Sequence, residues 1–392
     1  MPEPVSLRHG RLSAAVDPMG AQLLSLQLDG REYLWQGDPR FWARRAPVLF
    51  PIVGSLRDGR AESAQGTCAM GRHGIARNYE HAVVDRAADG SSVTFELRDS
   101  AETRAAYPYS FKLNMTYAIT GEATLSQTFR VTNTGDATLP FCVGGHPAFN
   151  VPVGSAADET FEDYVLKFAR PWSCTLPVIG EDGLMSWDNA FECPQGSDTV
   201  ELTHASFAHD ALMFTDVPDS VLTLLGTKSG HGVRVEFPGF PYIGVWSAAN
   251  DAPFVALEPW SGHTTAHDED DVRLIVLNVL GERFFRVVPE IEAPHLAEAA
   301  IAERFKGVRE RIADDQNFAE LRPVGLDDRL AHVAAHVGGV IGFRAGGVDH
   351  GAVGAFAVVP AGVGDGLRKI GLELLRDGGQ VVQLPVVGAN KD

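Results

Sequence analysis

The 392-residue sequence lacks the features of several common protein classes. It has no run of about 18 consecutive apolar residues, the length that a membrane-spanning helix needs. Its first residues, MPEPVSLRHG, contain no apolar segment typical of a secretory signal. Basic residues are scarce, since 33 Lys and Arg stand against 51 Asp and Glu, a net charge of −18. Such a surface repels phosphate backbones and anionic lipid, so we expect a protein that binds neither nucleic acid nor membranes. Because no signal segment is recognised, we expect it to be cytoplasmic.

Cysteine is also scarce. The four cysteines are Cys68, Cys142, Cys174 and Cys193, and none of them belongs to a CxxC pair. Their wide, irregular spacing argues against a zinc ribbon and against a disulfide framework. We interpret them as free thiols in a reducing compartment. The sequence also lacks the GxSxG motif of serine hydrolases and a convincing dinucleotide fingerprint.

Residues 1–292 show the alternation of apolar and polar residues that predicts β-strands. The clearest segments are SVTFELRDS, SFKLNMTYAIT, ATLSQTFRVTNTG and VRLIVLNVL. Turn signals such as ADGSS, ITGEA and NTGDA fall between strands, and no βαβ rhythm is present. The pattern predicts a mainly β fold, a large antiparallel sandwich or barrel.

The character of the sequence changes near Glu292. The next segment, APHLAEAAIAERFKGVRERIADD, has apolar residues at helical spacing, and a stretch rich in Gly, Ala and Val follows it. From His295 onwards there is no Trp or Tyr to anchor a separate core. We predict that residues 293–392 are a C-terminal extension, partly helical or poorly structured. A small α/β module and a chain read past its natural end are the alternatives.

Two histidines in the β region lie among glycines. His146, in FCVGGHPAFNVP, follows two glycines and precedes a proline, which predicts a tight turn where a ligand can approach the backbone. A core histidine bonded to a carbonyl is the alternative. His73, in RHGIARN, precedes Arg77 by four residues. This segment is either a solvated turn or a place where the guanidinium binds a hydroxyl or an anion.

Glu258 ends the apolar segment PFVALE and precedes Pro259 and Trp260. A carboxylate in such a strand is either paired or raised in pKa. Trp260 offers a flat apolar face of the kind that stacks on sugar rings. The alternative is a glutamate that closes the strand by a hydrogen bond to a turn.

The segment SGHTTAHDEDD after Trp260 raises the question of a metal site, because His263 and His267 are four residues apart. The β-branched Thr264 and Thr265 disfavour the helix that would bring these histidines together. The acidic run that follows is typical of a solvated loop and lacks the central glycine of a calcium loop. We therefore predict neither a metal nor any other cofactor.

In their order along the chain, these segments resemble the aldose 1-epimerase (galactose mutarotase-like) family, closest to its bacterial branch with HGFAR, GGHPAF and EPW motifs. The matching segments are LFPIVG, HGIAR, GGHPAFNVP, HDALMF, GVRVEFPGFPYIGVW and PFVALEPWSG. The resemblance runs from about Ser6 to Glu292. It implies a large antiparallel β-sandwich that interconverts the α and β anomers of a hexose, with a monosaccharide as substrate and no cofactor.

The resemblance also implies roles for single residues. His146 corresponds to the general acid that protonates the ring oxygen, and Glu258 to the general base that takes the proton of the C1 hydroxyl. His73 corresponds to a histidine that hydrogen-bonds the sugar near the reacting centre. Asp210, in HDALMF, corresponds to an aspartate that binds ring hydroxyls.

The sequence departs from the family where many relatives have an arginine and this chain has Ser55. Arg57 lies two residues further, which on a strand is the same face, so we expect it to replace that arginine. Two other functions stay open. A hexose-6-phosphate 1-epimerase would need an arginine cluster, for which the candidates are Arg44, Arg45, Arg57, Arg72 and Arg77. A non-catalytic carbohydrate-binding module is the other, although binding alone does not need an acid–base pair. The sequence does not indicate the oligomeric state.

Overall fold

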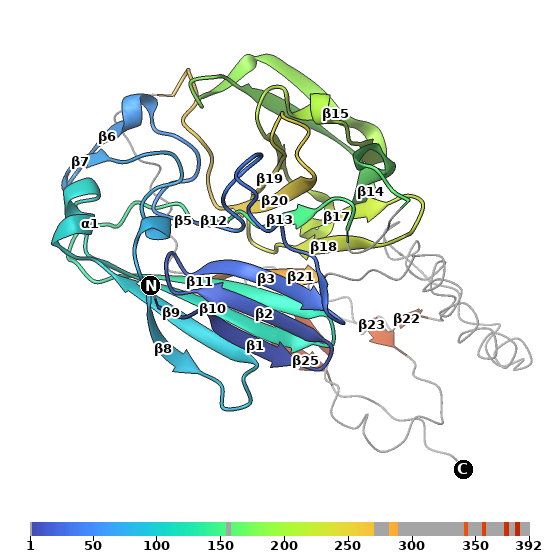
Figure 1. Ribbon diagram of the computed structural model, residues 1–392, viewed down its shortest axis with the longest axis horizontal. Helices are drawn as coiled ribbons and strands as arrows, with labels where there is room; N and C mark the ends of the chain where they lie inside the picture. Colours follow the sequence, from blue (N-terminus) through green and yellow to red (C-terminus); the bar gives the residue numbers. More distant parts are fainter. Residues whose placement is uncertain are drawn as a thin grey trace, which may run out of the picture. The chain divides into compact units, whose positions relative to one another are not determined.

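The computed structural model describes residues 2–153, 158–269, 282–288, 341–343, 355–357, 372–375 and 381–384. The chain divides into two compact units, Met1–Ala293 and Pro294–Asp392. In the first unit the described strands pair antiparallel, as the alternating sequence pattern predicted (Figure 1). The mainly β fold predicted from the sequence is therefore confirmed.

The largest sheet of the first unit has nine strands in the order β15-β14-β17-β18-β21-β11-β10-β9-β8. In chain order these are β8 (Ala82–Arg86), β9 (Ser92–Arg98), β10 (Phe111–Gly121), β11 (Thr124–Asn133), β14 (Tyr164–Ile179), β15 (Met185–Glu201), β17 (Val221–Gly226), β18 (Gly232–Glu236) and β21 (Glu282–Val288). Three of the four quoted segments form β9, β10 and β11, while the fourth, residues 272–280, lies outside the described residues.

A second sheet has four strands, β1 (Val5–His9), β2 (Leu12–Asp17), β3 (Gln22–Leu28) and β4 (Arg31–Glu32). Figure 1 shows β1 to β3 beside β9, β10 and β11. Alternate residues of β2 are buried, as expected of a strand with one face on the core. The Tyr117 hydroxyl of β10 donates to the Ala21 carbonyl at 2.6 Å and ties the two sheets together.

The third sheet has six strands and carries the candidate site. Its order is β16-β19-β20-β12-β5, and β13 also pairs with β20. The strands are β5 (Val48–Leu49), β12 (Gly144–Gly145), β13 (Ala148–Asn150), β16 (Leu212–Thr215), β19 (Tyr242–Trp246) and β20 (Phe254–Trp260). All seven residues of β20 are buried, because neighbouring strands flank it on both sides and apolar clusters cover both its faces. A strand with two buried faces has a continuous apolar run instead of alternation.

Shorter elements complete the first unit. They are the hairpin β6 (Arg60–Ser63) and β7 (Gly66–Ala69), the helix α1 (Ala101–Ala106), and the 3-10 turns η1 (Arg57–Gly59), η2 (Ala76–Asn78), η3 (Phe161–Asp163), η4 (His204–Phe207) and η5 (Pro218–Ser220). Helix α1 begins after Ser100, whose hydroxyl accepts the Thr103 N–H in a capping box.

In the second unit the structure describes two hairpins that the sequence analysis did not predict. Strand β22 (Ile341–Phe343) pairs with β23 (Ala355–Ala357), and β24 (Leu372–Leu375) pairs with β25 (Val381–Leu384). The helix predicted directly after Glu292 lies outside the described residues.

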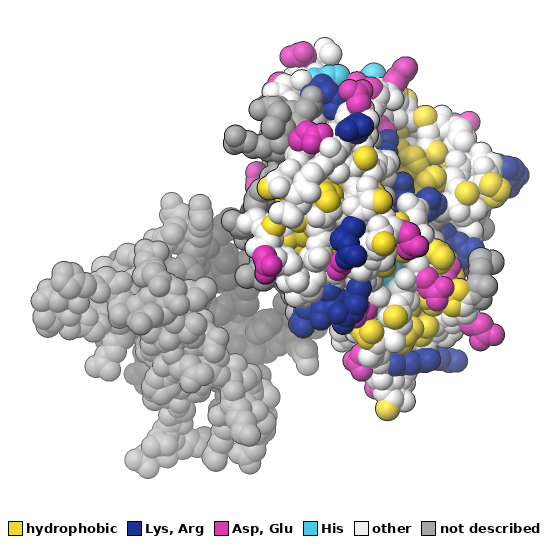
Figure 2. Space-filling view, turned by 90° about the vertical axis from the view of Figure 1, so that its left-hand side faces the viewer, with side chains coloured by type: hydrophobic (Ala, Val, Ile, Leu, Met, Phe, Trp, Pro, Cys, Tyr) yellow, Lys and Arg dark blue, Asp and Glu magenta, His cyan; other side chains and the backbone are white. Residues whose placement is uncertain are grey.

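Two further observations concern membrane-spanning helices and surface charge. Within the described part of the chain, no helix has both the length and the apolar character to cross a membrane. On the face shown in Figure 2, acidic and basic side chains are interspersed over the first unit.

Candidate active site

Glu258 enters the interior because it belongs to β20. It pairs with Gly244 of β19 on one side, and β12 and β13 flank β20 on the other. The Glu258 side chain is 1% exposed. A carboxylate in this position loses its hydration, so it needs either a partner or a proton.

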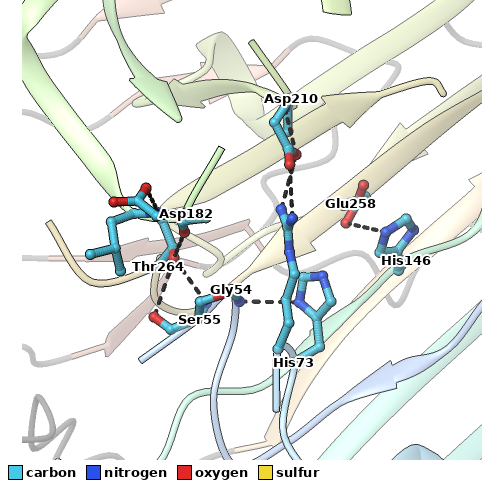
Figure 3. A network of polar contacts seen from close by, with 12 residues as sticks. Gly54, Ser55, His73, His146, Asp182, Asp210, Glu258 and Thr264 are labelled. Atoms are coloured by element: carbon cyan, nitrogen blue, oxygen red, sulfur yellow. Dashed lines mark hydrogen bonds and ion pairs between the residues drawn. The ribbon is translucent and has the colours of Figure 1, made fainter. Parts of the chain in front are cut away.

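His146 lies in the short link between β12 and β13, beside Glu258. The link is held against β20, because the Leu257 N–H donates to the Pro147 carbonyl at 3.1 Å. As a result His146 Nε2 lies 3.2 Å from Glu258 Oε2, although the two residues are far apart in sequence (Figure 3). The pairing of β13 with β20 thus produces an imidazole–carboxyl contact that neither segment contains alone.

Burial acts on both members of this pair in the same sense, since it disfavours their charged forms. It raises the pKa of Glu258 well above its usual value, an effect that the Arg72 charge opposes and the Asp210 charge reinforces. Burial and, to a smaller extent, the nearby guanidinium groups together lower the pKa of His146 to about 3. A pair that shares one proton has no net charge, whichever partner holds the proton. The two shifts therefore favour a single proton shared by the pair.

Aromatic rings fix the orientation of the His146 imidazole. Trp42 stacks on it with a centroid distance of 4.9 Å, and Trp246 meets it edge-on at 5.6 Å. The His73 ring also meets it edge-on, at 5.6 Å. These contacts leave His146 7% exposed and hold its Nε2 toward Glu258.

His73 is held by two hydrogen bonds with Gly54. The His73 N–H donates to the Gly54 carbonyl at 2.7 Å, and the Gly54 N–H donates to His73 Nδ1 at 3.1 Å. The backbone of His73 has a φ of 67°, and Gly74 follows with a φ of 73°. Because Nδ1 accepts, the neutral ring carries its proton on Nε2. Burial lowers the pKa of His73 well below its usual value, and the His146 charge acts in the same direction, so the ring is a neutral donor.

Asp210 is joined to the site through Arg72. The guanidinium donates to both carboxylate oxygens, at 2.8 Å from Nη1 and 2.9 Å from Nη2. This is the planar two-bond geometry in which arginine binds a carboxylate. Arg77, for its part, donates from Nη2 to the Arg72 carbonyl at 2.5 Å. Arg77 thus supports the backbone of the segment that carries Arg72 and His73.

Three expectations from the sequence need correction. The glycines before His146 do not leave room for a ligand, because a Cβ on Gly144 would lie 2.9 Å from the Trp260 ring and one on Gly145 would lie 2.6 Å from Phe285. Trp260 does not offer a free face to a sugar, because it is 5% exposed and belongs to a buried cluster. Its ring packs directly over Gly244, so we assign it to the packing of β20.

The third correction concerns Arg57. It does not follow Ser55 on a strand but begins the 3-10 turn η1. Its Nη2 donates to the Ala266 carbonyl at 2.9 Å and lies 3.3 Å from the carbonyls of His267 and Glu269. Arg57 therefore holds the 266–269 loop instead of pointing toward the His146–Glu258 pair.

The 261–269 loop has no helix, in agreement with the expectation from its β-branched residues. Thr264 anchors it, accepting from the Ser55 N–H at 2.9 Å and donating to the Gly183 carbonyl at 2.6 Å. His267 Nε2 lies 3.2 Å from Asp182 Oδ2, and both side chains are about half exposed. Among the described residues, no group of three or more His, Cys, Asp and Glu side chains could hold a metal ion.

A cavity of about 530 Å³ lies next to the site. Its lining includes Arg57, Gly71, Arg72, Asp182, Leu184 and His267. Arg72 is thus shared between the cavity and the Arg72–Asp210 pair. His73, His146 and Glu258 are not part of the lining.

The structure brings three of the predicted residues together, His73, His146 and Glu258, and joins Asp210 to them through Arg72. The residues that arrange this group were not predicted from the sequence. Trp42 carries no signal in its own segment that would link it to His146. The sequence presents Arg72 only as a candidate phosphate ligand. Its position directly before His73 could have indicated that Arg72 lies at the site, since two adjacent residues share the same turn of the backbone.

Comparison with known proteins agrees with this architecture. The family model described as aldose 1-epimerase matches residues 3–269. The protein LacX (plasmid form) of Lactococcus lactis subsp. lactis is 37% identical over 276 residues, which cover 68% of this chain and 91% of LacX. A galactose mutarotase related enzyme from Lactobacillus acidophilus has a similar structure, with a TM-score of 0.68 and 28% identity over 74% of this chain and 98% of that one. For a galactose mutarotase-like protein from Lactobacillus casei, the TM-score is 0.64 and the identity 29%, over 74% and 100% of the chains.

Proposed function

The chain belongs to the aldose 1-epimerase family, and from this premise we propose that it interconverts the α and β anomers of a free hexose by acid–base opening and closing of the ring. The observation that carries the proposal is the buried 3.2 Å contact between His146 Nε2 and Glu258 Oε2. The two reacting oxygens of a cyclic aldose, the C1 hydroxyl and the ring oxygen, are bonded to the same carbon. An acid and a base that serve them must therefore lie side by side, as these two groups do.

The proposed reaction needs two proton transfers in each direction. Glu258 takes the proton of the C1 hydroxyl while His146 gives a proton to the ring oxygen, and the bond between C1 and the ring oxygen breaks. The product is the open aldehyde, whose C1 carbonyl rotates about the C1–C2 bond. The reverse transfers then close the ring on either face and return both residues to their starting states.

The proton shared by His146 and Glu258 explains how the pair becomes active. In a dry pocket the neutral forms are favoured, with the proton on Glu258 and the imidazole uncharged. Hydroxyl groups of a bound sugar replace lost water contacts and stabilise charge. Transfer of the proton from Glu258 to His146 then produces the carboxylate base and the imidazolium acid without any change in net charge.

The remaining site residues have binding roles in this proposal. His73 presents an Nε2–H donor beside His146, suited to an oxygen near the reacting carbon. The Arg72–Asp210 pair presents fixed donors and acceptors to ring hydroxyls. Arg77 supports this arrangement through the Arg72 carbonyl.

The arginine geometry favours a free hexose over a hexose 6-phosphate. Arg45 donates to the Leu24 carbonyl, Arg57 to carbonyls of the 266–269 loop, and Arg72 to Asp210. A phosphate site needs guanidinium donors directed at the ligand. Arg77 also donates to a protein oxygen, the Arg72 carbonyl, so four of the five candidate arginines hold the protein's own oxygens instead.

The proposal can be tested by anomer exchange, followed by NMR or polarimetry, with glucose, galactose and their 6-phosphates. We expect the protein to accelerate exchange of at least one free hexose well above its 6-phosphate. Faster exchange of the 6-phosphates would indicate the phosphorylated substrate class instead. Sugar binding without any acceleration of exchange would contradict the proposal and indicate a carbohydrate-binding module.

A further inference from the structure

The indole ring of Trp260 lies beside Glu258 on one face of β20. The two residues are two positions apart on a strand, so their side chains point to the same side of the sheet. Gly244 of β19 is the strand partner of Glu258, and the Trp260 ring occupies the place where a side chain of residue 244 would stand. A Cβ on Gly244 would lie 2.4 Å from Cζ2 of the ring and 3.0 Å from its Cε2. The absence of a side chain at Gly244 therefore allows the ring to lie next to Glu258.

A second glycine fixes the edge of the ring that carries the nitrogen. Gly144 of β12 pairs with Trp260 on the other side of β20, and a Cβ there would lie 2.9 Å from Cδ1 of the ring. Nε1 is bonded to both Cδ1 and Cε2, so it lies between the atoms that contact Gly144 and those that contact Gly244. The indole N–H is thus held over β20 itself, the strand that carries Glu258.

The polar atoms of these two side chains are buried without a hydrogen bond. Within the described part of the chain, neither Trp260 Nε1 nor Glu258 Oε2 has a partner. A buried donor that lacks an acceptor is costly, so each such group in a folded protein calls for an explanation. Burial raises the pKa of Glu258, and the Trp260 N–H is near enough to oppose that rise. The donor is therefore placed to bind the carboxylate once the carboxylate forms.

We propose that Trp260 is a positioning residue whose indole N–H binds the Glu258 carboxylate when the proton has moved to His146. The inference rests on the proposed function and adds a residue to its mechanism. A hydrogen bond to an ionised group is roughly twice as strong as one between neutral groups. The indole thus stabilises the charge-separated form of the pair more than the neutral form. Stabilisation of this differential kind is what accelerates a reaction.

The charged and titratable groups that face Glu258 include His146, Arg72 and Asp210. Arg72 lowers the pKa of Glu258 and Asp210 raises it, and these two residues are paired with each other. His146, with His73 beside it, takes the proton that Glu258 gives up. The indole differs from these groups because it has no charge and does not titrate. It therefore acts on Glu258 as a fixed dipole, which a change of pH does not alter.

Trp260→Phe tests the proposal, because it removes the N–H and keeps an aromatic ring at the same position. Trp172→Phe is a matched control. Trp172 of β14 also has a buried Nε1 without a hydrogen-bond partner among the described residues, but its ring packs against Phe168 and Phe214. Anomer exchange of a free hexose, followed by NMR over a range of pH, gives kcat and KM for wild type and both variants.

We expect Trp260→Phe to lower kcat by about tenfold or more, the scale of one hydrogen bond to a charged group, and to change KM less than about twofold. The acidic limb of the kcat–pH profile should move to higher pH, because the carboxylate accepts a second proton more readily without its donor. Trp172→Phe should leave kcat, KM and the limb near their wild-type values. An acidic limb that stays in place in Trp260→Phe, or moves to lower pH, would overturn the proposal.

The contact can also be observed without reference to activity. The indole N–H signal of Trp260 in a nitrogen–proton NMR spectrum is identified by its loss in Trp260→Phe. This signal should shift with pH as the His146–Glu258 pair gains or loses a proton, and Glu258→Gln should abolish the shift. A signal that does not depend on pH, or that shifts equally in Glu258→Gln, would contradict the contact.

Two further outcomes are distinguishable in these experiments. If Trp260→Phe does not fold, a tryptophan analogue with sulfur in place of the N–H, introduced at position 260, provides the same kinetic and NMR tests. If wild type accelerates the exchange of no sugar, the proposed function is wrong. The indole signal then still decides whether Trp260 binds the Glu258 carboxylate.

Discussion

Two histidine–carboxylate pairs in this protein have the same separation and opposite surroundings. His146 and Glu258 lie 3.2 Å apart with side chains 8% and 1% exposed, whereas His267 and Asp182 lie 3.2 Å apart with side chains 48% and 51% exposed. Both pairs contain the residue types of acid–base chemistry. The His146–Glu258 pair is shielded from water. Among the described residues, it is also the pair of the two that lies against aromatic rings and a further histidine.

Residue type and distance by themselves therefore do not define a catalytic pair. An exposed pair has a Coulomb attraction screened by water and salt, and solvent already satisfies its groups. The two members of a buried pair exchange a proton with each other, or with a bound ligand, more readily than with bulk water. We therefore propose that the chemistry takes place at the His146–Glu258 pair and not at the exposed Asp182–His267 pair.

The largest expected effect separates the two pairs directly. Glu258→Gln removes the base and should lower kcat for a free hexose by about 10² or more, the usual scale of general acid–base catalysis. Asp182→Asn, the same kind of change in the exposed pair, should leave hexose kcat within about twofold of wild type, as expected where no catalytic proton is lost. Anomer exchange by NMR measures both. Near-normal turnover in Glu258→Gln would end the assignment of Glu258 as base.

The packing around the buried pair provides a second test. Gly244→Ala places a Cβ 2.4 Å from the Trp260 ring, so we expect it to lower the free energy of unfolding by about 1–3 kcal/mol. Gly71→Ala, in open space beside the cavity, should change it by less than about 0.5 kcal/mol. Urea unfolding measures the difference. Equal stabilities would show that Trp260 is not packed as described and would reopen its role in sugar binding.

The buried His81 shows how burial of a histidine makes stability depend on pH. His81 is 1% exposed, and its Nε2 lies 3.1 Å from the Ala76 carbonyl. Burial lowers its pKa to about 4, against the opposing effect of that backbone contact. The unfolded chain takes up this proton below about pH 6.5 and the folded chain only near pH 4, so His81 reduces stability as pH falls through this window.

The expected contribution of His81 is a loss of about 1–2 kcal/mol between pH 7 and pH 5. Glu258, with its raised pKa, acts in the opposite sense over the same range, because the folded chain keeps a proton there that the unfolded chain loses. The test therefore compares the pH dependence of stability in wild type with that in a variant that lacks His81. Urea unfolding of His81→Gln should show a weaker dependence on pH than wild type, and identical dependences would contradict the assignment.

The smallest expected effect concerns the charges beside Glu258. Arg72 lowers the pKa of Glu258 and Asp210 raises it. The pair is active with one shared proton, and uptake of a second proton gives the acidic limb of the kcat–pH profile. Arg72→Gln removes a positive charge that disfavours this second proton and should move the limb to higher pH, whereas Asp210→Asn should move it to lower pH. Shifts of less than about one pH unit are expected in each direction. Shifts of the same sign in both variants would show that the pair acts on Glu258 by position and not by charge.

The strands were predictable because their signal is local. Alternation in β9, β10 and β11 follows from side chains that point to opposite faces of a sheet. The motif order also led to His146 and Glu258. The prediction for Arg57 was wrong because it assumed a strand from Ser55 to Arg57, whereas the chain forms a 3-10 turn that begins at Arg57. Trp260 was misplaced because an aromatic residue beside a carboxylate has the same local pattern whether it packs inside or faces a ligand.

What the sequence determined by itself was the side-chain chemistry, the alternation of the strands and the unsuitability of the 261–269 segment for a helix. The tertiary structure alone decided which histidine meets which carboxylate, and which of the two pairs is dry. The physical reason is that alternation and turn preference depend on neighbours along the chain. Burial and proton affinity depend on groups brought together from distant segments, here by the pairing of β13 with β20.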